Sequence, residues 1–456
     1  MASITKSRDP LSNLPKSRFA VVWLRRDLRL EDNTALSAAL QSGVPVVPIF
    51  IFDPAILSKL SDRKDRRVHF IRERLAELRA ELRESGSDLA VFHEEPAKVF
   101  AKLAQGANVA AVYTNHDYEP YALERDGKIA KILKDQSVPF ETFKDQVVFE
   151  KREVAKADGL PYTVFTPYSK KWLAQLTDKD LGGRRCDKGE WAQWQGPGVP
   201  ALEDIGFEVS TLVYSAPRLD LSLIKKYADT RDIPSLPGTT RLGIHLRFGT
   251  ISPREAVKVA RKASEIWLKE LIWREFFMQI LWNFPHAANG PFRPEYAKVK
   301  WRHDEADFKK WIEGRTGYPI VDAGMRELAA TGFMHNRVRM IAASFLVKHL
   351  LIDWQWGEAY FAEKLDDFEL ASNNGNWQWI AGCGCDAAPY FRIFNPETQE
   401  KKFDGSGKYV KKWVPEFGTS RYPEPMVEHR FARYRTLTAY SKGLGRKAPE
   451  PSRESD

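Results

Sequence analysis

Residues Gly317–Pro396 read GYPIVDAGMRELAATGFMHNRVRMIAASFLVKHLLIDWQWGEAYFAEKLDDFELASNNGNWQWIAGCGCDAAPYFRIFNP. Apolar residues recur at steps of three and four through Val321–Leu328 and again through Val338–Leu351, which predicts two helices. At the start of the second helix, Asn336 and Met340 lie four residues apart and therefore share one helical face. An amide and two arginines in this turn are unusual for a helix that is otherwise apolar.

The later part of this stretch is rich in amides and indoles. Asn373, Asn374, Trp377 and Trp379 follow one another with no proline or charged residue between them. Together with the arginines of the preceding helix, these side chains suggest a cavity that holds a flat aromatic ligand. A helical core with internal polar hydrogen bonds would have the same composition, so the stretch alone leaves both interpretations open.

Length and composition indicate a soluble protein of more than one domain. The chain has 456 residues, enough for two or three domains, and is 43% hydrophobic and 29% charged. Its 14 tryptophans exceed what ordinary cores need, which suggests redox or stacking roles for some of them. The net charge of +9 permits a polyanionic partner but does not require one.

Cysteine usage and hydropathy exclude several classes of protein. The three cysteines, Cys186, Cys383 and Cys385, have no zinc-site spacing and are an odd number for disulfides, so we expect a reducing compartment and no metal. No apolar run is long enough to span a membrane. The N-terminus lacks the apolar segment of a signal peptide. It is basic and contains serines, as a transit peptide does, but Asp9, Pro10 and Pro15 favour a disordered tail over residues 1–16.

Strands and helices alternate through residues 17–149, which predicts right-handed crossovers and a doubly wound parallel sheet in an α/β domain. Ligands of such sheets bind beyond the carboxyl ends of the strands, but no G-x-G-x-x-G follows the first strand. The expected strands are Phe19–Leu24, Val46–Phe52, Leu89–His93, Val109–Thr114 and Phe140–Phe143. Four helices are expected. The first begins at Asp32–Thr34 and ends at Leu40, and the others cover Arg66–Arg83, Ala97–Leu103 and Tyr121–Lys134.

Three arginines, Arg25, Arg26 and Arg29, follow the first expected strand. They either clamp a ligand or form ion pairs, and an ion pair is the expectation for each one. The expected ion-pair partners are the acids nearest in sequence, Asp27, Glu31 and Asp32.

The rest of the chain changes character twice. Residues 150–217 have glycine-containing turns and few periodic runs, so we expect a long linker crossing a surface, with a short helix at Ser169–Leu176. Residues 218–444 have helical periodicity and predict an all-α domain. Residues 445–456 are polar and are expected to be a disordered tail.

Two segments of the expected helical domain could bind a ligand. Gly238–Arg241 offers hydroxyls and a cation before a helix start, which suits a phosphate, although an ordinary capped turn is the favoured interpretation. Glu270, Trp273 and Arg274 share one helical face. The carboxylate could relay protons or hydrogen bonds beside a flavin or base, or it could form an exposed salt bridge with Arg274.

Four segments together resemble the photolyase/cryptochrome family of flavoproteins, and the resemblance extends from Phe19 to about Tyr440. They are VVWLRRDLRLEDN (Val21–Asn33), GTTRLGIHLRFGTISPR (Gly238–Arg254), ELIWREFF (Glu270–Phe277) and the run from GRTGYPIVDAGMREL to YFRIFNP (Gly314–Pro396). The chain is most similar to class I cyclobutane pyrimidine dimer (CPD) photolyases of bacterial type. Photolyases of the (6-4) lesion carry histidines at Asn336 and Met340, and plant cryptochromes carry aspartate at Asn373.

The resemblance implies an α/β domain, a long linker and a helical domain that holds FAD folded into a U. It implies that light excites the reduced FAD, which passes an electron to a dimer flipped out of DNA. The phosphates would be held by Tyr227, Thr239, Thr240, Arg241 and Leu242. The ring and ribityl chain would be lined by Arg274, Arg339, Asp367 and Asn373, with Arg339 and Asp367 forming an ion pair. Gly243 and Glu369 depart from the usual residues near FAD.

The same resemblance implies residues for catalysis, DNA binding and electron transfer in a deoxyribodipyrimidine photo-lyase. The lesion pocket would be lined by Glu270, Trp273, Asn336, Met340 and Trp379. DNA would be bound by Arg337, Arg392, Trp273 and Trp379. The electron chain would be Trp377, Trp354 and Trp301. Trp377 and Trp379 are two residues apart and should point to nearly opposite sides of a helix. Trp356 is a further indole with no assigned role.

Other expectations concern the second chromophore and the partners. The family implies an antenna in the α/β domain, a folate, deazaflavin or flavin, near a segment like Asn115–Asp126. We expect a cytoplasmic monomer that acts on UV-damaged DNA containing pyrimidine dimers, without a membrane. The alternatives are a cryptochrome-type blue-light receptor without repair activity and a helical nucleic-acid-binding protein without photochemistry.

Overall fold

The computed structural model describes residues 10–211 and 213–447, which fold into two compact units. The first unit takes its described residues from Met1–Glu150, Leu176–Leu219 and Leu242–Val259. The second takes them from Lys151–Gln175, Asp220–Arg241 and Ala260–Asp456. Both units are therefore built from segments that are discontinuous in the sequence.

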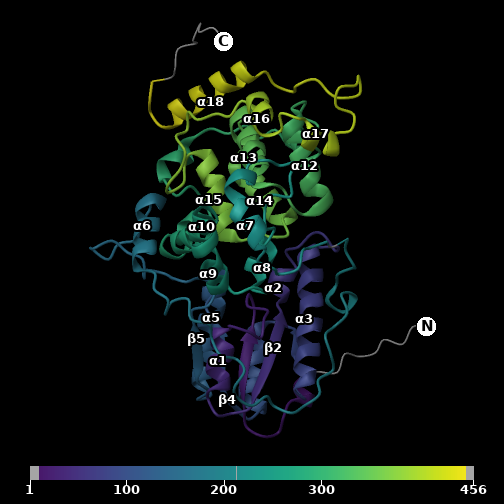
Figure 1. The fold of residues 1–456 in the computed structure, drawn as a ribbon, viewed down its shortest axis with the longest axis vertical. Helices are drawn as coiled ribbons and strands as arrows, with labels where there is room; N and C mark the ends of the chain where they lie inside the picture. Colours follow the sequence, from purple (N-terminus) through teal and green to yellow (C-terminus); the bar gives the residue numbers. More distant parts are fainter. Residues whose placement is uncertain (1–9, 212, 448–456) are drawn as a thin grey trace, which may run out of the picture. The chain divides into compact units, whose positions relative to one another are not determined.

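The first unit contains a five-stranded sheet in the order β3-β2-β1-β4-β5, in which all neighbouring strands are parallel (Figure 1). The strand order reverses between β1 and β4, because each half of the sheet grows outward from β1. The predicted fold class of this part is confirmed. The strands are β1 (Phe19–Leu24), β2 (Val46–Phe52), β3 (Ala90–His93), β4 (Val109–Asn115) and β5 (Phe140–Phe143).

Alternate residues of the strands enter two separate cores, as the two-residue period of a strand requires. One core joins Val22 and Phe50 to α1 and α3, and the other joins Val21 and Ile49 to α4 and α5. The helices of this unit are α1 (Thr34–Leu40), α2 (Pro54–Leu57), α3 (Arg66–Glu84), α4 (Pro96–Gly106), α5 (Pro120–Asp135), α8 (Gly243–Phe248) and the beginning of α9 (Pro253–Ala263).

The arginines after β1 form ion pairs, but with partners that differ from the acids nearest in sequence. Arg25 pairs with Asp126, Arg26 with Asp117 and Glu119, and Arg29 with Asp145 at 2.5 Å. These acids follow β4 and β5, which end at the same edge of the sheet as β1. The expected ion pairing is thus confirmed and the expected partners were wrong, because parallel strands bring distant segments together.

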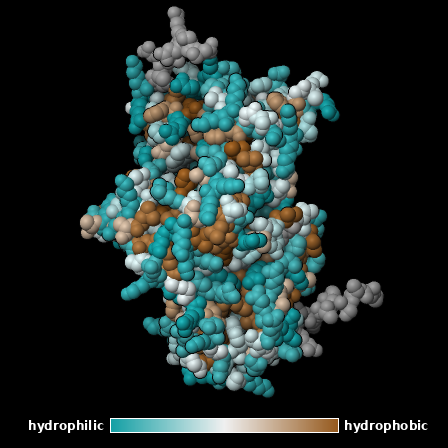
Figure 2. All heavy atoms as spheres, in the orientation of Figure 1, coloured by the Kyte–Doolittle hydropathy of each residue, from teal (hydrophilic) through white to brown (hydrophobic). Residues whose placement is uncertain are grey.

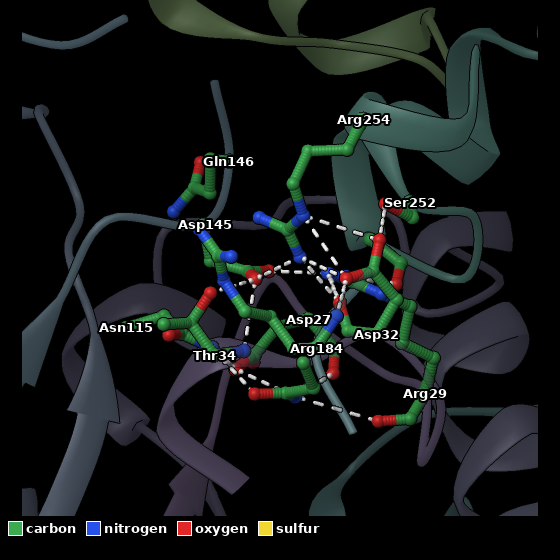
Figure 3. Close-up of polar contacts among 12 residues, drawn as sticks. Asp27, Arg29, Asp32, Thr34, Asn115, Asp145, Gln146, Arg184, Ser252 and Arg254 are labelled. Atoms are coloured by element: carbon green, nitrogen blue, oxygen red, sulfur yellow. Dashed lines mark hydrogen bonds and ion pairs between the residues drawn. The ribbon is translucent and has the colours of Figure 1, made fainter. Parts of the chain in front are cut away.

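Asp145 is the centre of a buried charge network (Figure 3). Its carboxylate accepts from Arg29 and, at 2.8 Å, from Arg254, which also pairs with Asp32 at 2.9 Å. Burial opposes ionisation, but the two guanidiniums hold the pKa of Asp145 below its usual value. The network fastens the start of α9 to the sheet.

The second unit is helical around one large core (Figure 1). The predicted helix Val338–Leu351 is α13 followed by a π-helical segment, Phe345–His349. The helices of this unit are α6 (Phe165–Gln175), α7 (Leu221–Thr230), α10 (Glu265–Asn283), α11 (Glu305–Ile312), α12 (Pro319–Thr331), α13 (Asn336–Ser344), α14 (Trp354–Lys364), α15 (Leu370–Ala381), α16 (Pro396–Phe403), α17 (Lys408–Trp413) and α18 (His429–Gly443).

The segment expected to be a surface linker is divided between the two units. Its first part forms α6, whose Trp172 is buried in the helical unit, and its second part buries Ile205 and Phe207 in the α/β unit. The expected N-terminal tail begins outside the described residues, but Pro10–Asn13 forms a short 3₁₀ helix, and Leu11 and Leu14 pack on a core. Most of the expected C-terminal tail lies outside the described residues.

Three further observations concern the surface, the hydropathy of the helices and the cysteines. Hydrophilic residues cover most of the face seen in Figure 2, and apolar residues gather around the place of α7 and α10. Within residues 10–211 and 213–447, no helix combines the length and the apolar character needed to cross a membrane. The three cysteines are free thiols.

Candidate active site

A cavity of ≈ 350 Å³ lies among the helices of the second unit. Its walls come from α10, α13 and α15, from the end of α14 and from the segment between α14 and α15. Sequence-predicted site residues that line it are Glu270, Trp273, Arg274, Asn336, Arg339, Met340, Asp367, Asn373, Trp377 and Trp379. These predicted residues, from three separate parts of the chain, are therefore brought to one place.

Helix α10 contributes one wall. Its N-terminus is capped by Ser264, whose hydroxyl accepts from the Trp267 amide, and its i, i+3 and i+4 positions carry Glu270, Trp273 and Arg274 into the cavity. The Trp273 indole stacks on Phe165 with ring centroids 3.6 Å apart and planes 5° apart. One indole face is thus held by α6, which fixes the orientation of the ring.

Glu270 is paired, but its partner is Arg231 and not Arg274. Arg231 follows α7, and its guanidinium lies 2.5 Å from the carboxylate. Burial raises the pKa of Glu270, and the positive charge of Arg231 opposes that rise. Glu270 thus forms a salt bridge, as one interpretation of the sequence expected, but with a different cation. Arg231 also lines the cavity.

Helix α13 contributes a second wall, and His335 caps its N-terminus. His335 accepts from the Arg337 amide through Nδ1 at 3.2 Å, and burial lowers the pKa of His335 to about 4, so the ring stays neutral and able to accept. Asn336 and Met340, one turn apart, both reach the cavity. Arg337 pairs with Asp232 at 2.8 Å.

The predicted ion pair of Arg339 and Asp367 is present at 3.0 Å. Arg339 also donates from Nε to the Met334 carbonyl at 2.7 Å, which fixes the plane of the guanidinium. The second carboxylate oxygen of Asp367, Oδ1, is buried and has no hydrogen-bond partner among the described residues. A buried acceptor without a partner is costly, so this atom points to a missing donor from a ligand.

Helix α15 contributes the amide and indoles of the third wall. Asn373 donates from Nδ2 to the Glu358 carbonyl at 3.0 Å. The Glu358 side chain interacts with Asn373 and Asn374, and burial raises its pKa to about 7. Trp377 is buried and Trp379 half-buried. Both indoles line the same cavity. Their two-residue spacing therefore gives them different degrees of burial and does not direct them to different cavities.

Other predicted site residues lie outside the cavity lining. Tyr227 is on α7, and Leu242 belongs to the residues of the α/β unit. Arg241 is exposed with φ 51° and places its guanidinium 4.2 Å from the Phe333 ring centroid. The predicted site residues that do not line the cavity are Tyr227, Thr239, Thr240, Arg241, Leu242, Trp354, Trp301, Arg337 and Arg392.

The turn before Arg241 is held by a close backbone approach. A Cβ on Gly238 would lie 2.6 Å from the Thr230 Cβ, and the Thr230 hydroxyl donates to the Gly238 carbonyl at 3.0 Å. Glycine is therefore required at this position for packing alone. Packing thus accounts for Gly238 without a phosphate, but the expected cap is not found, because α8 begins after Leu242 with no side-chain cap hydrogen bond.

Several lining residues were not identified from the sequence. Arg231 lines the cavity, and Glu358 lies outside the lining but interacts with Asn373 and Asn374. Neither carries a local signal, since each acts on a residue that is remote in the chain. Phe277 continues the α10 stripe and could have been found from its four-residue step after Trp273. The cavity-lining residues that were missed include Arg231, Phe277, Phe361, Phe368, Ser372 and Asn376.

Comparisons of both parts of the chain with known proteins point to the same family. A family described as DNA photolyase matches residues 20–184, and one described as the FAD binding domain of DNA photolyase matches residues 267–421. The chain is 35% identical to a deoxyribodipyrimidine photo-lyase of Synechococcus sp., over 95% of this chain and 98% of that protein.

Two solved structures are similar over nearly their whole length. A bacterial class III photolyase from Agrobacterium tumefaciens has a TM-score of 0.83 and 32% identity, covering 97% of this chain and 100% of that one. An archaeal photolyase from Sulfolobus tokodaii, solved with two FAD molecules, has a TM-score of 0.82 and 35% identity, covering 93% and 100%.

Proposed function

Because this chain belongs to the DNA photolyase family, we propose that it is a deoxyribodipyrimidine photo-lyase that uses light to repair cyclobutane pyrimidine dimers in DNA. The observation that carries this proposal is the arrangement of one cavity. Residues predicted to meet a lesion, Glu270, Trp273 and Trp379, line it together with residues predicted to meet a flavin, Arg339 and Asn373.

The residues of the cavity fit FAD. The free Oδ1 of Asp367 can accept from an N–H on the edge of a flavin, while Arg339, paired to the other oxygen, keeps positive charge beside the ring. The Asn373 amide can hydrogen-bond to a ring nitrogen without adding charge. When bound and reduced, FAD supplies an electron donor that is activated by light. Arg274, Arg339, Asp367 and Asn373 would hold the ring, and Tyr227, Thr239, Thr240, Arg241 and Leu242 the phosphates.

The other side of the cavity suits a pair of pyrimidines. Trp273 and Trp379 offer flat faces, and each stacked base contributes about 1–3 kcal/mol. A dimer must leave the base stack to reach the cavity, and its weakened pairing lowers the cost. Asn336 can read a carbonyl or imide edge, and Met340 fills the remaining apolar space.

Glu270 has the most specific part in this proposal. Its carboxyl can hydrogen-bond a thymine and move a proton to an oxygen that gains charge when the dimer receives an electron. Arg231 keeps the carboxylate oriented before the substrate arrives. Binding therefore requires the Glu270 side chain to exchange part of this ion pair for a hydrogen bond to the base.

DNA binding would use the excess of positive charge. Arg392 is exposed in the loop after α15 and is free of the cavity lining, which suits a phosphate contact. Arg337 would contact phosphate only by sharing or leaving Asp232. Phosphate contacts position the protein, and lesion specificity stays with the cavity.

The remaining parts of the proposal rest on the family alone. Trp377, Trp354 and Trp301 would form an electron chain to the flavin. A second chromophore in the α/β unit is supported by the two FAD molecules of the Sulfolobus structure, and a folate, deazaflavin or flavin would each serve. Membership in class I, a monomeric state and a cytoplasmic location also remain predictions, and one similar structure is of class III.

A repair assay distinguishes this proposal from a cryptochrome-type receptor. The purified protein with FAD is chemically reduced, mixed with oligothymidine that contains cyclobutane dimers and illuminated with near-UV light. A lyase restores the absorbance of the bases in the light and not in the dark. Fully reduced, FAD-loaded protein that leaves the dimers intact would exclude the lyase and favour the receptor.

A further inference from the structure

A buried lysine, Lys348, lies in the π-helical segment that follows α13. Every residue of this segment, Phe345–His349, is buried, and Lys348 is only 1% exposed. π-Helical turns are rare and occur frequently at functional sites. Within residues 10–211 and 213–447, no carboxylate pairs with the ammonium. An unpaired buried charge is costly, so apolar packing alone does not account for a lysine at this position.

The ammonium is surrounded by groups from three other parts of the helical unit. Nζ donates to the carbonyl of Ala381, the last residue of α15, at 3.2 Å. It also donates to the Tyr390 carbonyl at 3.2 Å and lies 4.0 Å from the centroid of the Tyr440 ring on α18. The carbonyl end of a helix carries partial negative charge, and the face of an aromatic ring attracts a cation. Lys348 therefore connects α15, α18 and the loop between α15 and α16.

The loop of residues 383–395 is anchored differently in its two halves. Its beginning is held by Asp386, whose carboxylate accepts from the Phe165 amide at 3.0 Å. In residues 387–394, the bond from Lys348 is the one hydrogen bond to another element among the described residues. The second half of the loop thus has a single polar anchor, and that anchor is the buried lysine.

The Tyr390 ring is fixed together with its carbonyl. It stacks on the Tyr440 ring with centroids 5.6 Å apart and planes 5° apart, and the Arg446 guanidinium lies 5.5 Å from its centroid. Arg392, two residues later, donates its amide to the Pro389 carbonyl at 2.9 Å, and its side chain is exposed. A turn therefore encloses Tyr390, so the place at which Tyr390 is held determines where Arg392 emerges.

We propose that Lys348 is a positioning residue: it fixes Tyr390 and thereby holds residues 387–394 in the conformation in which Arg392 meets a phosphate of bound DNA. This role rests on the proposed function, which gives Arg392 a phosphate contact. Lys348 itself touches no substrate, because it is buried and does not line the cavity. It acts on the affinity for DNA and not on the photochemical step.

The charge of this lysine can change near neutrality. Burial lowers the pKa of Lys348 to about 7. Burial raises the pKa of the Cys383 thiol, which faces the ammonium, to about 12, and raises that of the Tyr440 hydroxyl well above its usual value. Burial lowers the pKa of His349, on the same segment, to about 3. As pH rises through about 7, Lys348 loses its charge, its attraction to the carbonyls and ring weakens, and the loop should loosen.

The first test separates positioning from stability. Lys348→Met keeps a long side chain and removes the charge. We expect a Tm equal to or above that of the parent, because an apolar group replaces an unpaired buried charge. The affinity for dimer-containing DNA should fall about tenfold, as for the loss of one charged hydrogen bond. The effect should appear in KM, with kcat at saturating DNA retained.

Two further variants complete this test. Lys348→Arg keeps a cation and should recover part of the affinity. Lys309→Met removes a charge from a side chain that is 74% exposed on α11 and should leave the affinity unchanged. A lower Tm with unchanged DNA affinity in Lys348→Met would make the lysine a stabilising residue and would overturn the proposal. A fall in kcat with KM unchanged would overturn it too.

The parent protein provides a measurement that does not depend on the folding of a variant. Hydrogen exchange of free protein is followed at several pH values on both sides of 7 and corrected for the intrinsic exchange rates. We expect the protection of the Arg392 amide to fall as pH rises through about 7. Protection of this amide that does not depend on pH would contradict an anchor made by the lysine charge.

Failure of the anchor and failure of the proposed function give different results. Unchanged DNA affinity in Arg392→Gln would refute the phosphate contact, and with it the effect of Lys348 on DNA. Unchanged protection of residues 387–394 in Lys348→Met, with DNA affinity that still depends on Arg392, would refute the anchor alone. The account predicts that both variants bind DNA more weakly and that Lys348→Met also loses protection in the loop.

Discussion

Arg231 and Glu270 form an ion pair 2.5 Å long at the wall of the cavity, although they are 39 residues apart. Both side chains are partly exposed, 24% for Arg231 and 34% for Glu270, so the pair faces the space that a substrate would enter. The carboxylate is therefore oriented before any ligand binds. Burial raises the pKa of the Glu270 carboxyl, and the positive charge of Arg231 opposes that rise.

Replacing Glu270 by glutamine should lower repair and leave FAD bound. The change keeps the size of the side chain but removes the charge that Arg231 orients. Loss of a hydrogen bond to a charged group costs about 1.5–3 kcal/mol, so we expect roughly tenfold to hundredfold slower repair at limiting substrate. Glu265→Gln, at an exposed position on the same helix, is the control. Release of flavin by Glu270→Gln would show that the residue belongs to the cofactor.

Replacing Trp273 by alanine should weaken the binding of dimer-containing DNA. The indole presents one face to Phe165, and its removal takes a stacking surface from the cavity. The expected loss is about 1–3 kcal/mol of binding free energy, measured by fluorescence anisotropy with labelled oligonucleotides. Trp273→Phe should recover part of the affinity. Equal loss for undamaged DNA would mean that Trp273 supports general DNA binding and not the lesion.

Trp377 and Trp379 should separate two activities. Trp377→Phe should block light-driven reduction of oxidised FAD and leave repair by pre-reduced protein intact, because Trp377 is buried beside the aromatic core. Trp379→Phe should have the opposite effect, because its indole is half-buried at the cavity. Flavin absorbance measures the first activity and base absorbance the second. Failure of both activities in either variant would reject the division of roles.

Adding a methyl group at Gly357 should destabilise the helical unit. The new Cβ would lie 2.1 Å from Cη2 of Trp377 and 2.6 Å from a methyl carbon of Leu346, and neither neighbour has room to withdraw in the core. Overpacking of this kind costs about 1–3 kcal/mol, visible as a lower Tm in thermal unfolding. Gly290→Ala is the matched control, since nothing lies within 4 Å of its added Cβ. Equal Tm values for the two variants would contradict the packing described for Trp377.

Glu358 should make stability depend on pH below neutrality. Burial raises the pKa of its carboxyl from 4.5 to about 7, so the folded protein holds the proton more tightly than the unfolded chain. The folded state therefore loses stability as pH rises from about 4.5 to about 7, and Glu358→Gln should remove this part of the dependence. Urea unfolding at several pH values measures it. An unchanged pH profile in Glu358→Gln would assign the dependence to other groups.

The sequence predicted what short-range physics determines. The run FAVVWL gave β1 with correct ends because every residue of a central parallel strand is buried. The four-residue spacing of Asn336 and Met340 placed both at the cavity because helical geometry is local. The ion pair of Arg339 and Asp367 came from family resemblance, since no local rule joins residues 28 positions apart.

Long-range pairing was the part that could not be derived. The sequence suggested a salt bridge between Glu270 and Arg274, its neighbour on the helix, but in the structure Glu270 pairs with Arg231. Arg29 likewise pairs with Asp145, which is remote in the sequence. Phe207 is buried although its segment has no hydrophobic periodicity. The partners of polar and irregular segments are set by tertiary contacts, which the local hydrophobic periodicity of the sequence does not predict.

The cavity is proposed to repair a flipped cyclobutane dimer with light. The most direct measurement illuminates pre-reduced, FAD-loaded protein with matched oligonucleotides that carry a cyclobutane dimer, a (6-4) lesion or no damage, and separates the products by chromatography. We predict that only the cyclobutane dimer returns to two intact thymines, in the light and not in the dark. Persistence of that dimer, or repair of the (6-4) lesion in its place, would contradict the claim.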